Sequence, residues 1–189
     1  MARGEDTRNR ILDAAIGLLG EAGIEGFSAA NLAAVAGVSK ANLFHHFESL
    51  DQIVLEAFER FALNMPMMTP TEDMDLRGWL IGMGDSMFGL DERESEAVRA
   101  YFLFVAKALF DEKLRKTVLG TVEQASAMMI DIVRQFSRAG TSDTEVEALG
   151  NLIFTTADGM ALHFFAFPER RHLVAAGWGA LVNAVAPER

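Results

Sequence analysis

The chain has 189 residues, of which half are hydrophobic and 23% are charged, a composition typical of a folded globular protein and not of a disordered one. It carries 17 Lys and Arg against 27 Asp and Glu, a formal charge of −10, and no cysteine. The lack of cysteine excludes disulfides, zinc fingers and a thiol nucleophile. The first ten residues are polar and the longest apolar run covers only residues 100–106, so we expect a cytoplasmic protein without a secretory signal or membrane span.

Apolar residues follow helical spacing along nearly the whole chain, and no stretch shows the strict alternation of a strand. The pattern predicts an all-α protein of about nine helices, short ones first and long ones after. Short helices are predicted from Thr7 to Gly23, over 29–36 after a Ser28 N-cap, over 40–47 after a Ser39 N-cap, and after a Ser49 N-cap. Residues 65–71 predict a loop, and longer helices are predicted over 73–90, 95–110, 111–138, 143–167 and 169–186.

Residues 28–47 predict a helix, a turn at Gly37 and a second helix, which is the helix-turn-helix arrangement. The side chains expected to hold it together are Leu32, Val35, Val38, Leu43 and Phe47. Lys40, Ala41 and Asn42 would then face outward, where a lysine reaches phosphate or guanine, an asparagine pairs with adenine and an alanine permits close approach. This arrangement predicts a helix that can enter a DNA major groove.

Bulk charge counts against this interpretation. The first sixty residues hold five basic and nine acidic residues, a balance of −4. DNA binding would therefore depend on where the cations lie and on free N–H groups at the helix starts near Thr7, Ser28 and Ser39.

The stretch from about Thr7 to Leu55 contains the motifs TRNRILDAA at 7–15, GVSK at 37–40, LFHHF at 43–47 and SL at 49–50. These motifs give it a resemblance to the DNA-binding domain of the TetR family of bacterial transcriptional repressors. The resemblance implies a homodimer in which residues 1–48 form the DNA-binding domain and residues 49–189 the ligand-binding and dimerisation domain. It places DNA contacts at Arg8, Ser28, Ser39, Lys40, Ala41, Asn42, Phe44, His45 and His46.

Three positions depart from the family pattern. Phe44 stands where a tyrosine is usual, Leu50 where a lysine is common, and Ala30 where a polar or basic residue often lies. At least one phosphate contact is thereby lost, so we expect affinity to rest more on Arg3, Arg8 and Arg10.

Met and Phe residues at helical spacing in the second domain ordinarily form a core, but the resemblance places an effector cavity among them. The candidate lining residues are Phe61, Met65, Met83, Met87, Phe102, Met129, Asn151, Thr155 and Asp158. Flexible methionines suit a hydrophobic or amphipathic effector. Asp158 shares a helix face with Asn151 and Thr155, where it either orients a polar or cationic head group or faces solvent.

The last two predicted helices carry stripes of apolar and small residues that permit close helix approach. The candidate dimer-interface residues are Leu149, Ile153, Met160, Phe164, Leu173, Gly177 and Leu181. Two such helices from each subunit would make a four-helix bundle, and the alternative is packing within one chain. Two-fold symmetry would place the two recognition helices about 34–36 Å apart on a palindromic operator.

Other chemistry has little support in the sequence. Gly82 to Gly84 lies inside a helical pattern and not after a strand, so it is no phosphate loop, and adjacent His45 and His46 point about 100° apart on a helix. We therefore expect no enzyme, no cofactor and no metal site. The sequence predicts a repressor that binds double-stranded operator DNA and is released by a small effector. A helical small-molecule-binding protein with an impaired DNA-reading head is the main alternative, and an uncharacterised enzyme is a weaker one.

Overall fold

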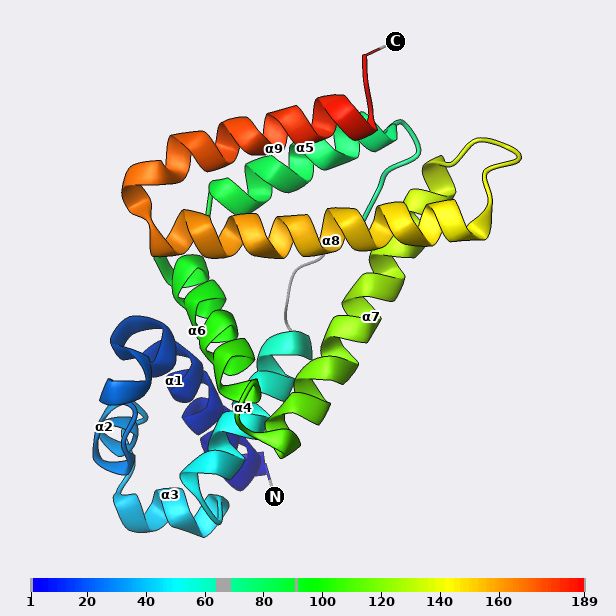
Figure 1. Ribbon diagram of the computed structural model, residues 1–189. Helices are drawn as coiled ribbons and strands as arrows, with labels where there is room; N and C mark the ends of the chain where they lie inside the picture. The colour runs from blue at the N-terminus through cyan, green and yellow to red at the C-terminus, as the bar shows by residue number, and fades with distance from the viewer. Residues whose placement is uncertain (1, 64–68, 91, 189) are drawn as a thin grey trace. The chain divides into compact units, whose positions relative to one another are not determined.

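The structure is a computed structural model that describes the chain apart from residues 1, 64–68, 91 and 189, and apart from the side chains of 2, 3, 63 and 92–94 (Figure 1). The described residues form nine α-helices, one 3₁₀ turn and no strand, which confirms the predicted all-α fold. The elements are α1 (Ala2–Gly26), α2 (Ala29–Val35), α3 (Lys40–His46), α4 (Leu50–Leu63), α5 (Leu76–Phe88), α6 (Glu92–Ala108), α7 (Glu112–Phe136), α8 (Asp143–Ala166), η1 (Pro168–Arg170) and α9 (Arg171–Val185).

The helices divide into two compact units. The first takes in the described residues of 1–65 and 91–121, and the second those of 66–90 and 122–189. Helices α4 and α6 therefore pack with α1 in the first unit, and α7 contributes residues to both. The domain boundary predicted after residue 48 divides the chain by function, into a DNA-binding part and a ligand-binding part, and it stays a prediction.

The first unit is built on a close approach of α1 to α6. A Cβ at Gly20 would overlap the backbone of Glu96, so only glycine lets the two helices meet here. The Gly20 carbonyl, 2.9 Å away, accepts a hydrogen bond from Nε of Arg99. Behind this contact, Phe58 of α4 and Phe104 of α6 pack edge to face with their ring centroids 5.3 Å apart. Helix α2 packs against α1 of this core, and α3 packs against α2.

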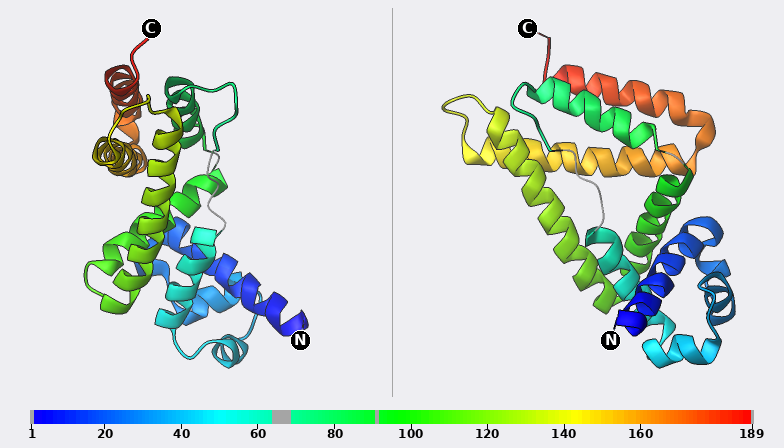
Figure 2. Two further views of the ribbon diagram at one scale, coloured as in Figure 1. Left: turned by 90° about the vertical axis from the view of Figure 1, so that its right-hand side faces the viewer. Right: turned by 180° about the vertical axis from the view of Figure 1, so that it is seen from behind.

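The second unit is built on α5, α8, α9 and the larger part of α7. Helices α5 and α9 lie side by side in all views (Figures 1 and 2). Trp178 of α9 is buried, and its Nε1 donates a 2.9 Å hydrogen bond to the carbonyl of Leu80. Gly84 makes room for this indole, because a Cβ there would overlap the ring. Arg77 of α5 also links the two helices, because it donates a hydrogen bond to the carbonyl of Ala186, 2.9 Å away, just after α9 ends.

The starts of α2 and α3 and the turn between them agree with the N-cap and glycine positions predicted from the sequence. The Ser28 and Ser39 hydroxyls accept hydrogen bonds from the N–H groups of Asn31 and Asn42, which confirms both N-caps. Gly37 has φ 64°, the left-handed conformation that favours glycine.

Two expectations for this unit are wrong. Thr7 is not an N-cap, because α1 begins at Ala2 and Thr7 lies inside the helix, so its N–H cannot serve a phosphate. Val35 is 60% exposed, because Leu32 and Ala33 make the buried contact of the seven-residue α2.

No helix in the described part of the chain is long and apolar enough to cross a membrane.

Candidate nucleic-acid interface

The turn between α2 and α3 is closed by main-chain hydrogen bonds. The N–H of Val38 donates to the carbonyl of Ala33 at 2.9 Å, and the N–H of Gly37 donates to the carbonyl of Ala34 at 3.2 Å. The Ser39 cap then starts α3 directly after the turn. Together these contacts fix the amino end of α3 relative to α2.

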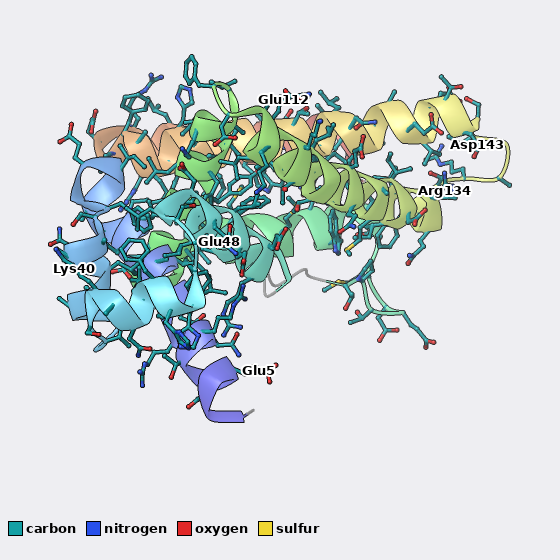
Figure 3. The ribbon with its side chains drawn as sticks, turned by 90° about the horizontal axis from the view of Figure 1, so that it is seen from below. Glu5, Lys40, Glu48, Glu112, Arg134 and Asp143 are labelled. Atoms are coloured by element: carbon teal, nitrogen blue, oxygen red, sulfur yellow. The ribbon has the colours of Figure 1, made fainter. Side chains whose placement is uncertain are left out.

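Helix α3 separates an inner from an outer face over only seven residues. Leu43 and the following Phe47 are buried with 0% and 2% exposure. The predicted contact residues on the other side divide as follows: Lys40, Ala41, Phe44 and His45 are exposed, and Asn42 and His46 are half-buried. Lys40 lies at the edge of the unit (Figure 3). The expected outward face of α3 is therefore present. The amino end of α1 lies beside the carboxyl end of α3, because a Cβ at Gly4 would lie 4.0 Å from the His46 ring.

Arg8, predicted to contact DNA, makes contacts within the chain. Its guanidinium forms an ion pair with Glu56 of α4. Its Cζ also lies 4.7 Å from the centroid of the Phe47 ring, a cation–π contact. The charge of Arg8 is thus neutralised at the meeting point of α1, α4 and the end of α3.

A second arginine among the first sixty residues is also paired within the chain. Arg60 forms a bidentate ion pair with Asp13, in which Nε donates to Oδ1 at 2.5 Å and Nη2 donates to Oδ2 at 2.9 Å. Hydrogen bonding to Asp13 raises the pKa of the Arg60 guanidinium, which keeps it charged. Of the basic side chains described between residues 4 and 60, Lys40 and Arg10 are the exposed ones for which no ion pair is found. The head therefore presents few cations to a phosphate backbone.

The second unit contains a hollow of about 320 Å³ between α7 and α8. It is lined by Val122, Glu123, Ser126, Ala127, Ile130, Asn151, Phe154 and Thr155. Ser126 donates a 2.7 Å hydrogen bond to Oδ1 of Asn151, so polar groups stand at the rim of a partly apolar surface. The size lies near the lower end of small-molecule sites.

The candidate effector residues do not gather in one place. Asn151 and Thr155 line the hollow, and Asp158 is half-buried further along α8. Three other candidates belong to the core of the second unit, where Met129 is buried and Met83 and Met87 pack against it. Two lie in the first unit, where Phe61 is buried and Phe102 is half-buried. Met65 lies outside the described residues. Ser126 and Phe154 of the hollow were missed, although Val122, Ser126 and Ile130 are spaced four residues apart along one face of α7.

The candidate dimer residues mostly serve the core of a single chain. Ile153 is completely buried, and Leu149, Met160 and Leu181 pack against the same core. Gly177 faces Met160 across α8 and α9, and Phe164 packs on Phe88 with centroids 4.9 Å apart. Leu173 differs from these, because it is 53% exposed. Packing within one chain, the stated alternative, thus accounts for most of this stripe.

Comparisons with known proteins agree with the geometry. Residues 11–57 match the bacterial regulatory proteins of the tetR family. An uncharacterized HTH-type transcriptional regulator of Mycobacterium tuberculosis is 32% identical over 175 residues, covering 88% of this chain and 87% of the relative.

Solved structures show the same fold. A putative transcriptional regulator from Saccharomonospora viridis, in complex with choline, gives a TM-score of 0.76 at 17% identity and covers 98% of this chain and all of the other. The multidrug binding protein EbrR, complexed with imidazole, gives a TM-score of 0.59 at 27% identity and covers 92% of this chain and 93% of the other. These relatives are transcriptional regulators or binding proteins and not enzymes. The match of residues 11–57 and the relative from Mycobacterium tuberculosis establish that this chain belongs to the tetR family of bacterial transcription regulators.

Proposed function

We propose that this protein is a ligand-responsive repressor that binds a palindromic operator as a homodimer and is released by a small amphipathic effector. The outward face of α3 is the observation that carries the proposal. Leu43 and Phe47 hold this helix from behind, and Lys40 and Phe44 stand on its exposed side. A short helix presented in this way fits the width of a DNA major groove.

Individual contacts follow from the chemistry of each side chain. Lys40 supplies the cation closest to the start of α3, and Asn42 supplies an amide for an adenine edge. The Ser28 and Ser39 oxygens accept their cap hydrogen bonds, which leaves each hydroxyl proton to donate to a phosphate.

A two-fold dimer requires an apolar surface that the single chain leaves open. Exposed apolar and small residues follow one another on α8 at Leu152, Gly159 and Leu162, and on α9 at Leu173, Ala176 and Ala180. We assign the four-helix bundle to these faces, because the stripe containing Ile153 is already used inside the subunit. Native mass spectrometry of the protein with its DNA should show two chains on each operator.

Lys40 gives the decisive test of DNA binding. Fluorescence anisotropy with DNA from upstream of the gene should show binding that weakens with salt, and Lys40→Ala should raise Kd about tenfold or more. Lys113→Ala is the matched control, because Lys113 is an exposed lysine of the same unit that lies on α7 and not on α3. Equal Kd values for Lys40→Ala and the wild type would contradict the placement of α3 in the groove.

The second candidate function, a small-molecule-binding protein with an impaired reading head, is favoured by one observation. Two of the five cations of residues 1–60 are committed to Glu56 and Asp13, in a stretch whose formal charge balance is already −4. No binding to the upstream DNA at low salt would support this candidate over repression.

An amphipathic effector is supported by the α7–α8 hollow and by the neighbours, one of which holds choline and the other imidazole. We propose that the half-buried Asp158 orients the cationic end of such a ligand. Asp158→Ala should leave thermal unfolding nearly unchanged but abolish release of DNA by choline or by another hydrophobic cation. An unchanged response to the cation would exclude this role for Asp158.

A further inference from the structure

The direction in which α3 points is set mainly at its two ends. The helix has seven residues, of which Leu43 is the buried one, and an isolated helix of this length is unstable in water. Its amino end is held by the Gly37 turn and the Ser39 cap. Its carboxyl end is held by Phe47 and by the junction to α4 that begins at Glu48.

A continuous set of side-chain contacts ties this junction to α1. Glu56 accepts from Arg8 through Oε2 and from the Gln52 amide nitrogen through Oε1, the latter at 3.0 Å. The Gln52 amide oxygen in turn accepts the N–H of Glu48 at 2.6 Å. Arg8 also covers the ring of Phe47, so it contacts the first residue after α3 directly and is linked to the second, Glu48, through Glu56 and Gln52.

The burial and the charge of Arg8 and Glu56 indicate that their ion pair holds the structure together. The Glu56 side chain is 17% exposed and that of Arg8 is 38% exposed, so the ion pair is partly removed from water. A carboxylate with this burial is destabilised when its cation is removed. The Arg8 charge therefore compensates the Glu56 carboxylate.

We propose that Arg8, Glu56 and Gln52, the Arg8–Glu56–Gln52 network, position the recognition helix α3 against α1 and α4 and so set DNA affinity without touching DNA. This proposal rests on the DNA binding proposed above. It assigns Arg8 a positioning role in place of the phosphate contact predicted from the sequence. Glu56 and Gln52, which the sequence offered no reason to single out, become determinants of affinity.

The variant Glu56→Gln separates the two roles of Arg8 by the sign of its effect. If Glu56 only restrained a DNA-contacting Arg8, its neutralisation would free that cation, remove a negative charge and lower Kd. If the network positions α3, Glu56→Gln raises Kd, and we expect a rise of about tenfold. The matched control is Glu59→Gln, which removes the same charge from an exposed position of the same helix.

The salt dependence of the variant Arg8→Met supplies a second readout. Loss of a phosphate contact lowers the slope of log Kd against log salt by about 0.9, whereas loss of a positioning contact raises Kd at an unchanged slope. The double variant with Glu56→Gln should bind no worse than the weaker single variant, because both changes break one ion pair. A reduced slope for Arg8→Met, or tighter binding by Glu56→Gln, overturns the proposal.

Hydrogen exchange of the free protein tests positioning without any DNA. Arg8→Met and Glu56→Gln should each speed amide exchange over residues 43–48, and Glu59→Gln should leave it unchanged. Unchanged protection in both network variants overturns the proposal whether or not DNA binds. Faster exchange in a protein whose wild type binds no upstream DNA keeps the positioning network and overturns only the repressor function.

Discussion

Helices α3 and α8 are held in place in opposite ways. Helix α3 has seven residues and one buried side chain, and its position comes from a turn and a cap at one end and from the Arg8–Glu56–Gln52 network at the other. Helix α8 has 24 residues and buries five of them along one face. The DNA-reading helix α3 therefore depends on a few local contacts, whereas the second unit depends on packed apolar area.

The largest expected effect on stability lies in the second unit, at Trp178. Trp178→Ala empties a buried site between α5 and α9, and it should lower the free energy of unfolding by about 3–5 kcal/mol. Urea unfolding followed by circular dichroism measures the loss. Trp178→Phe keeps most of the ring and should cost clearly less, so a loss below 1 kcal/mol for Trp178→Ala would show that area does not dominate this unit.

An intermediate effect is expected at Gly37 in the head. An alanine at φ 64° is strained although no atom crowds the site, so Gly37→Ala should cost about 1–2 kcal/mol and weaken DNA binding as well. Gly17→Ala is the control, because Gly17 is a helical position with equally open surroundings, where alanine is favoured by up to about 1 kcal/mol. Thermal unfolding should therefore shift in opposite directions. Equal shifts would remove the special role of the turn.

The smallest expected effect is at the start of α8, where Ser142 and Glu145 form a capping box. Ser142→Ala should cost about 1 kcal/mol at neutral pH. Hydrogen bonds from the Ser142 side chain and backbone lower the pKa of Glu145, so its contribution is present above the ordinary glutamate pKa and is lost as the pH falls through the lowered value. The difference in thermal unfolding between wild type and Ser142→Ala should therefore narrow in acid. A constant difference would show that the carboxylate adds nothing to the cap.

The same contrast explains which features could be predicted from the sequence. The N-caps at Ser28, Ser39 and Ser49 and the turn at Gly37 depend on residues within three or four positions of each other, and all are present. The outward side of α3 followed from them.

Long-range contacts could not be predicted in this way. Arg8 and Glu56 are 48 positions apart, and nothing in the spacing of either residue indicates the other. Helix α8 carries apolar residues on several faces, with Ile153 buried and the adjacent Leu152 49% exposed, so periodicity alone did not show which stripe belongs to the core. The hollow between α7 and α8 is lined by residues of both helices, so no local sequence pattern contains it.

The contacts of the two chain ends have a practical consequence for protein engineering. Gly4, in the first turn of α1, lies beside His46 at the end of the recognition helix, and Arg77 donates hydrogen bonds to Asn183, Ala186 and Glu188 near the end of α9. A tag or fusion partner joined close to Gly4 or to Glu188 would therefore disturb the end of the recognition helix or the hydrogen bonds of Arg77. Residues 138–141, an exposed turn closed by the ion pair between Arg134 and Asp143 (Figure 3), offer a gentler insertion point for a reporter.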